Sequence, residues 1–262
     1  MRGESYRPHA FLAAMLGWTW ALWLPVALFG LDPWSGPGRT LLYLGGIGPL
    51  LAGLWFQHRY SAGRGLRDLW VRLVDPRRAP VWLWCAAIAL IPVLSLTAHS
   101  LLALTGSTLP EITLPGGSWP AAVGFAAFIF LLGPLPEEIG WRGYGLDVLL
   151  DRHAPVLASL ILAAVWGVWH LPLFAMEGYY ADFGGPPVLW LFLWSILMKT
   201  LIMTWGYLVS ERSLLLMVVF HFMVNFTGEM VVMPPNAEFV FQALLSIAGF
   251  TAAAYLMWWR RA

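Results

Sequence analysis

The sequence has little charge and is poor in the residue types that cover the surface of a soluble protein. Only 11% of its 262 residues are Asp, Glu, Lys or Arg, whereas 60% are hydrophobic. Because a soluble domain carries about 25% charged residues, this composition excludes that class. A net charge of +1 gives no electrostatic reason for nucleic-acid binding. We therefore expect an integral membrane protein whose partners include the lipid bilayer and no nucleic acid.

Cysteine and linker segments are also scarce. Cys85 is the single cysteine, so no intramolecular disulfide can form. No Ser-rich or Gly-rich linker divides the chain and no segment repeats at a fixed period, which favours one membrane-embedded domain over residues 1–262. The first apolar run is too long for a signal peptide and lacks a clear cleavage site, so we expect it to remain as a helix.

Long apolar runs are abundant. Crossing a hydrocarbon core of about 30 Å takes roughly 20 helical residues. Strands of a membrane barrel would instead alternate in polarity, and these runs do not. The sequence predicts an all-α, polytopic membrane protein of about eight transmembrane helices, near residues 8–30, 40–57, 80–104, 119–139, 155–176, 187–209, 214–233 and 237–259.

The arginines indicate the orientation. With eight crossings, thirteen of the fourteen arginines fall on one side of the membrane, and Arg39 alone falls on the other. This count treats Arg142 as one of the loop residues that follow the fourth run. Cytoplasmic loops carry the excess of Lys and Arg, so both termini are predicted to be cytoplasmic. The Arg-rich, almost Lys-free composition suggests the plasma membrane of a bacterium with high genomic GC content.

Residues 65–78, GLRDLWVRLVDPRR, differ from the apolar runs. Leu66, Trp70, Leu73 and Val74 share one helical face, while the charged residues lie mostly elsewhere. The segment is predicted to be an interfacial amphipathic helix on anionic lipid.

Residues 134–145, PLPEEIGWRGYG, place three charges at the end of an apolar run. The prolines predict a kink or restart of the helix. Glu138 and Arg142 are four residues apart and can form an ion pair, whereas Glu137 points about 100° away. Glu137 has no cation nearby in the sequence and is the candidate general base. The alternative is that all three charges are solvated at a cytoplasmic helix end.

Two further apolar runs carry polar residues at helical spacing. In VWGVWHLPLF, Trp166 and His170 share a face, and in VVFHFMVNF, His221 and Asn225 share a face. Each could be a packing residue taken alone. Since polar groups at such depth usually face a cavity or the bundle interior, their joint occurrence with Glu137 indicates one shared polar cavity.

That cavity has the groups for amide hydrolysis. A carboxylate and an imidazole can hold and deprotonate a water molecule, and a second imidazole with an amide NH₂ can donate to an oxyanion. Zinc is the alternative, with Glu137, His170 and His221 as ligands, although no HExxH motif is present.

Together the three motifs resemble the CPBP family of membrane peptidases, which includes type II CAAX prenyl endopeptidases and bacteriocin-processing or self-immunity proteins. EExxxR matches Glu137, Glu138 and Arg142, and HxxxN matches His221 and Asn225. FxxxH matches His170, with Trp166 in place of the usual Phe. This motif core spans residues 137–225.

The resemblance implies an intramembrane endopeptidase with a cavity open to the cytoplasm. Glu137 and His170 would activate water, His221 and Asn225 would form the oxyanion site, and Glu138, Arg142 and Trp166 would support them. Substrates would be membrane-associated peptides or proteins, lipidated in some members. Catalysis without a cofactor is favoured, because Asn225 is a poor zinc ligand. A non-catalytic scaffold or immunity protein, which would use the cavity for binding, is the alternative, and a transporter ranks third.

One mismatch in depth remains. If the fourth helix ends near residue 139, Glu137 lies at the cytoplasmic boundary, while His170 lies roughly 20 Å inside it at 1.5 Å per residue. Residues 154–160 could stand above the membrane, or the break near Pro134 could draw the glutamates inward.

Overall fold

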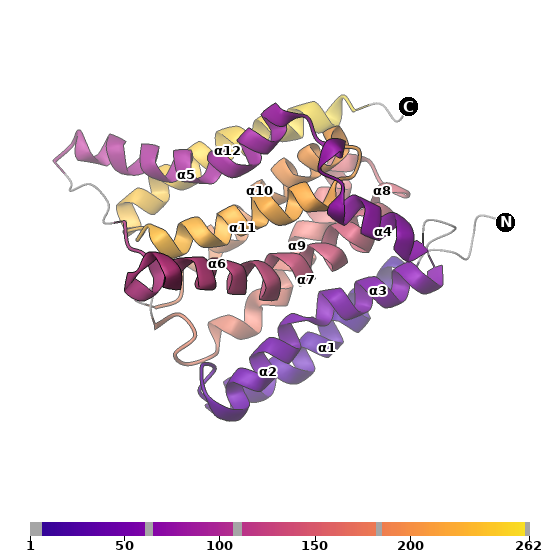
Figure 1. Cartoon of the computed structure of the whole chain (residues 1–262), viewed down its shortest axis with the longest axis horizontal. Coiled ribbons are helices and arrows are strands. Elements are labelled where there is room, and N and C mark those ends of the chain that lie inside the picture. Colours follow the sequence, from indigo (N-terminus) through magenta and orange to yellow (C-terminus); the bar gives the residue numbers. More distant parts are fainter. Residues whose placement is uncertain (1–6, 61–64, 107–111, 182–184, 260–262) are drawn as a thin grey trace.

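The computed structural model describes residues 7–60, 65–106, 112–181 and 185–259. Throughout these residues the regular elements are helices, and β-pairing is limited to an isolated bridge between Ile112 and Val231. The long helices run through one bundle, with α4 packed across one of its ends (Figure 1). The helices are α1 (Pro8–Leu28), α2 (Gly36–Gly46), α3 (Gly48–Tyr60), α4 (Gly65–Val74), α5 (Val81–Ala103), α6 (Trp119–Leu132), α7 (Pro134–Gly140), α8 (Leu146–Leu150), α9 (Pro155–Phe174), α10 (Leu189–Val209), α11 (Leu214–Met230) and α12 (Pro235–Met257).

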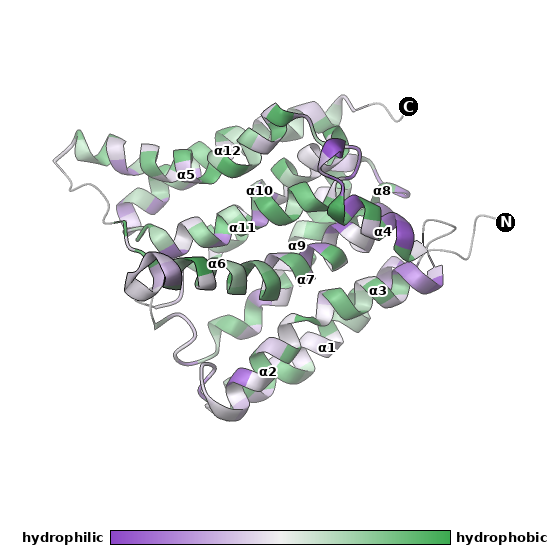
Figure 2. Cartoon of the chain, viewed as in Figure 1, coloured by the Kyte–Doolittle hydropathy of each residue, from purple (hydrophilic) through white to green (hydrophobic). Residues whose placement is uncertain are grey.

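The all-α membrane fold is confirmed. In the described residues, seven helical segments are long and apolar enough to cross a membrane, two of them being the broken helices α2–α3 (Gly36–Tyr60) and α6–α8 (Trp119–Leu150). The remaining expected crossing is α11, an apolar helix of 17 residues. The helices consist mainly of hydrophobic residues, and strongly hydrophilic residues gather around α4 and the neighbouring helix ends (Figure 2).

The expected end of the fourth helix near residue 139 is wrong. After the predicted break, α7 begins at Pro134 and continues through the π-helical turn η3 (Trp141–Gly145) into α8, so the segment reaches Leu150. Arg142 is therefore not a loop residue, and its side chain is fully buried inside this segment. It gives no information on orientation.

The longer helix removes the mismatch in depth. Glu137 lies 13 residues before the end of α8 at Leu150, and His170 lies 15 residues after the start of α9 at Pro155. At 1.5 Å per residue these distances are about 20 Å and about 22 Å. The two side chains are therefore level because the fourth helix extends further, and residues 154–160 need no unusual placement.

A second register brings α11 to the same level. Arg212, just before α11, forms an ion pair with Asp147 in α8, with Nη2 and Oδ2 2.5 Å apart. Glu138 lies nine residues before Asp147, and His221 lies nine residues after Arg212. Both stretches are mainly helical and of equal length, and Glu138 Oε1 lies 2.8 Å from His221 Nδ1.

Helices α3 and α7 approach closely through glycines. A Cβ added at Gly53 would lie 2.8 Å from the backbone oxygen of Ile139, and one added at Gly140 would collide with the backbone of Pro49. Backbone atoms cannot move aside as a flexible side chain can, so only glycine fits at these two positions. The contact fixes α7 against α3 at the residues that follow the glutamates.

The amphipathic segment is present as α4, followed by the short 3₁₀ helix η1 (Pro76–Arg78). Trp70 and Val74 are exposed, as expected for a face turned to lipid, but Leu69 and Arg72 are buried. The helical pattern separates Arg72 from the apolar face but does not indicate its burial, and α4 docks on the bundle through this arginine.

Candidate active site

A break in the fourth helix positions the glutamate pair. Gly133, with φ −114° and ψ −92°, lies between α6 and α7, and Pro134 occupies the first helical position of α7, where its missing N–H costs no bond. Glu137, four residues after Gly133, donates from its backbone N to Gly133 O at 3.2 Å. A π-helical turn follows directly, a feature that occurs often at functional sites.

Glu138 is the centre of a buried polar triad. Its Oε1 accepts from Arg142 Nη1 at 2.8 Å, as the i, i+4 spacing predicts, and from His221 Nδ1 at 2.8 Å. Glu138 and Arg142 are fully buried, His221 is 4% exposed and Glu137 is 8% exposed. The alternative that these charges are solvated at a helix end is therefore wrong.

Glu137 points to a different neighbour. Its Oε2 accepts from Trp166 Nε1 at 3.0 Å, and one turn further along α9 the Nδ1 of His170 lies 2.7 Å from Trp166 O. A backbone carbonyl only accepts, so Nδ1 of His170 carries the proton and Nε2 of the neutral ring is an acceptor. Nε2 of His170 is therefore the nitrogen that can accept a proton.

Trp166 connects the two carboxylate environments. The guanidinium carbon of Arg142 lies 4.6 Å from the centre of its ring, a cation–π contact. Its ring meets that of His221 edge-on at 5.2 Å and that of His170 at 5.9 Å. The departure from Phe in FxxxH thus has a consequence, because indole donates a hydrogen bond to Glu137 and phenyl cannot.

Asn225 lies one helical turn beyond His221 on α11 and is half-buried. Its Nδ2 lies next to Gly133, where an added Cβ would be 3.6 Å away. The amide therefore sits at the break that precedes the glutamates. The printed contacts connect six of the residues expected from sequence, and the seventh, Asn225, lies beside Gly133; the six are Glu137, Glu138, Arg142, Trp166, His170 and His221.

A zinc site fits this arrangement poorly. Among the described residues, no three His, Cys, Asp or Glu side chains are placed to hold a metal ion. Glu138, the carboxylate nearest His221, is already bonded to Arg142 and to the His221 ring. Glu137, His170 and His221 thus do not form a set of three metal ligands.

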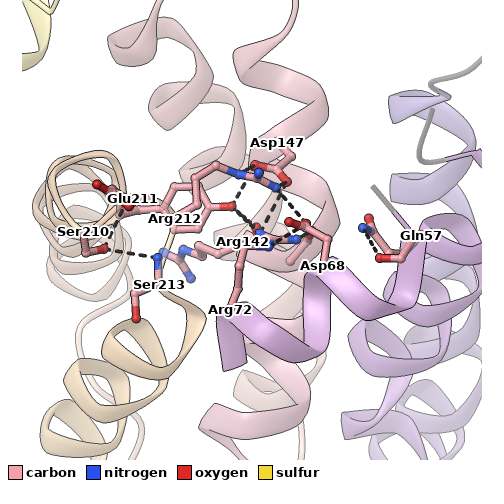
Figure 3. A network of polar contacts seen from close by, with 12 residues as sticks. Gln57, Asp68, Arg72, Arg142, Asp147, Ser210, Glu211, Arg212 and Ser213 are labelled. Atoms are coloured by element: carbon pink, nitrogen blue, oxygen red, sulfur yellow. Dashed lines mark hydrogen bonds and ion pairs between the residues drawn. The ribbon is translucent and has the colours of Figure 1, made fainter. Parts of the chain in front are cut away.

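Sequence reasoning missed a polar network between α4, α8 and the end of α10. Asp68, Arg72, Asp147 and Arg212 form its ion pairs, seen together in Figure 3, and Tyr207 hydrogen-bonds within it. Apart from Asp68 and Arg72, which are four residues apart on α4, these residues are far apart in sequence. The position of Arg72 within an apolar stretch next to Leu69 is the signal that could have indicated burial, although the amphipathic pattern favours the lipid interface.

Comparisons with known proteins give matches that include the residues of this site. Residues 119–227, which include all seven side chains, match the family described as "Type II CAAX prenyl endopeptidase Rce1-like". The protein "CAAX prenyl protease 2" of Methanococcus maripaludis is 24% identical over 259 residues, covering 97% of this chain and 94% of the relative. The two matches support the CPBP family that the motifs resemble, and with it an intramembrane endopeptidase of the CAAX protease type in an integral membrane protein.

Proposed function

We propose that this protein hydrolyses peptide bonds of membrane-associated substrates with a water molecule activated by Glu137 and His170. The observation that carries the proposal is the different bonding of the two neighbouring glutamates. Glu138 is held by Arg142 and His221, whereas Glu137 accepts a hydrogen bond from Trp166, the residue whose backbone carbonyl accepts from His170. One carboxylate organises the site, and the other takes part in the chemistry.

The reaction begins with a water molecule between Glu137 and His170. As its oxygen attacks the carbonyl carbon of the scissile bond, its proton passes to Glu137 or to Nε2 of His170. Negative charge then develops on the carbonyl oxygen, where the Asn225 amide and protonated His221 donate hydrogen bonds. Transfer of that proton to the amide nitrogen lets the carbonyl re-form and the C–N bond break, which releases the amine and the carboxylic acid.

The proposed reaction uses no metal ion. The support is chemical: an Asn amide donates well to an oxyanion and binds zinc poorly, and the described side chains form no three-ligand group. We propose zinc-independent turnover, to be checked by measuring metal content and activity before and after chelation on one sample. Stoichiometric zinc that is lost together with activity would overturn it.

We propose that the substrates are prenylated or otherwise lipidated proteins whose cleaved segment lies at the membrane. The name of the matching family supports this class. We also propose that the site opens to the cytoplasm and that both termini lie there. The start of α1 and the end of α12 are at the end of the bundle where α4 docks (Figure 1), and arginines of the α3 end, α4 and η1 are on this side: Arg59, Arg67, Arg72, Arg77 and Arg78.

The test is cleavage of membrane-tethered reporter peptides by purified protein in lipid, comparing wild type with Glu137→Gln and His170→Ala. Both variants are expected to keep the fold and lose cleavage, because each removes a group that receives the water proton. Glu138→Gln with no activity beside an active Glu137→Gln would reverse the roles of the two glutamates. No cleavage by folded wild-type protein would favour a binding scaffold instead.

A further inference from the structure

The helical segment that carries both glutamates widens over η3, directly after them. Leu146 N bonds to Trp141 O, five residues earlier, in place of the usual four. Buried backbone carbonyls need donors, and here they meet side chains of other helices. Gly143 O accepts from Arg72 Nη2 of α4 at 3.0 Å, and Arg142 O lies 3.0 Å from the Tyr207 hydroxyl of α10.

Arg72 makes several of these contacts with one buried side chain. Besides Gly143 O, it donates from Nη1 to the Tyr207 hydroxyl at 2.7 Å, and its Nε lies 2.9 Å from the Asp68 carboxylate. The Tyr207 hydroxyl has one proton, which goes to Arg142 O or to the nearer Asp147 at 2.7 Å. The hydrogen bond from Arg72 to Gly143 O does not depend on this choice, so Arg72 is the more reliable donor to the π-helical turn η3.

Arg212 joins the same carboxylates from the other side (Figure 3). Its Nη2 lies 3.2 Å from Asp68 and 2.5 Å from Asp147. Its backbone is left-handed, with φ 67°, as is that of Glu211, with φ 51°. Such strain persists where surrounding contacts enforce it. Because Arg212 pairs with both carboxylates, Asp68 and Asp147 would each keep a cationic partner if Arg72 were replaced.

We propose that Arg72 is a positioning residue of the peptidase site, which sets the direction of Glu137 and Glu138 by holding the η3 backbone at Gly143. This inference rests on the proposed function. Gly143 follows Glu138 by five residues in the same helical segment, and Leu69 of α4 packs beside it, since a Cβ added at Gly143 would meet Leu69 at 3.3 Å. Docking of α4 is thereby linked to the geometry of the carboxylates.

The test compares Arg72→Met with wild type in lipid, using the reporter peptides. Misplacement of a reacting group by about 1 Å costs about 10² in rate, so kcat is expected to fall by about tenfold to 10² while KM stays within about twofold. Hydrogen exchange should become faster in residues 141–147 and stay unchanged in α5 and α12, which hold none of the polar partners of Arg72 described above. Tyr207→Phe, which keeps the ring packing, should give a smaller fall in kcat.

Arg77→Met is the matched control, since Arg77 lies in η1 close behind α4, is 89% exposed, and pairs with Asp75. It should leave kcat and hydrogen exchange unchanged. The proposal would be overturned if folded Arg72→Met kept the wild-type kcat, or if Arg77→Met lost as much kcat as Arg72→Met. If Arg72→Met does not fold, Tyr207→Phe decides by the same two measurements. Failure of wild type to cleave any peptide would instead count against the proposed function.

Discussion

The ion pair between Glu138 and Arg142 allows the sharpest prediction about stability. Both side chains are fully buried, and their atoms Arg142 Nη1 and Glu138 Oε1 are 2.8 Å apart. Replacing Arg142 by Met keeps much of the volume and leaves the Glu138 carboxylate buried with His221 as its neighbour. Breaking a buried pair by removing one partner costs about 3–5 kcal/mol. We expect this loss in the free energy of unfolding of Arg142→Met.

Removing the second charge should recover part of this loss. In the double variant Glu138→Gln with Arg142→Met, neither buried charge remains, and the Gln side chain can still accept from His221. Replacing both partners of a buried pair is often near neutral. The double variant should therefore unfold with a higher free energy than Arg142→Met alone, with a coupling of about 2 kcal/mol or more between the two sites.

Reversible unfolding in mixed detergent micelles measures all four members of this cycle. Glu137→Gln serves as the comparison, since its amide oxygen can still accept from Trp166 Nε1, and it should lose less stability than Arg142→Met. Additive effects of the two substitutions, with a double variant less stable than either single one, would refute the account of a mutually dependent buried pair.

Two further predictions follow from the site and its packing. Asn225→Ala should lower kcat by about 10² or more without loss of fold, if its amide donates to the oxyanion, and single-turnover cleavage measures this; a loss under threefold would remove Asn225 from that role. Gly140→Ala should destabilise the protein, because the new methyl group collides with the backbone of Pro49, whereas Ala at Gly124, which has open space, should not. Thermal unfolding of the two variants side by side checks this, and equal midpoints would contradict the packing described.

Local spacing predicts much of the site. The i, i+4 rule pairs Glu138 with Arg142, and the helical faces group Trp166 with His170 and His221 with Asn225. The family resemblance, matched by the comparisons, supplies the roles. Which of these helices touch one another is not predictable from spacing, since the contact of Glu138 with His221 depends on the register set by Asp147 and Arg212.

The end of the fourth helix shows where hydropathy fails. Residues 140–150 contain Arg142 and Asp147 with three glycines, which on average hydropathy indicates a loop. The structure buries both charges, Arg142 against Glu138 of the same segment and Trp166 of α9, and Asp147 against Arg212, so the helix continues to Leu150. Contacts with Trp166 and Arg212 cannot be deduced from this segment alone, and the burial of Arg72 could not be deduced from the pattern of α4 for the same reason.

The division of labour between Glu137 and Glu138 is the central claim, and one measurement tests it most directly. Cleavage of a membrane-tethered reporter by Glu137→Gln and Glu138→Gln should be measured beside wild type, with the folded fraction of each sample determined. The account predicts that Glu137→Gln is stable and inactive, while Glu138→Gln loses stability and keeps measurable activity per folded molecule. Activity retained by Glu137→Gln would contradict it.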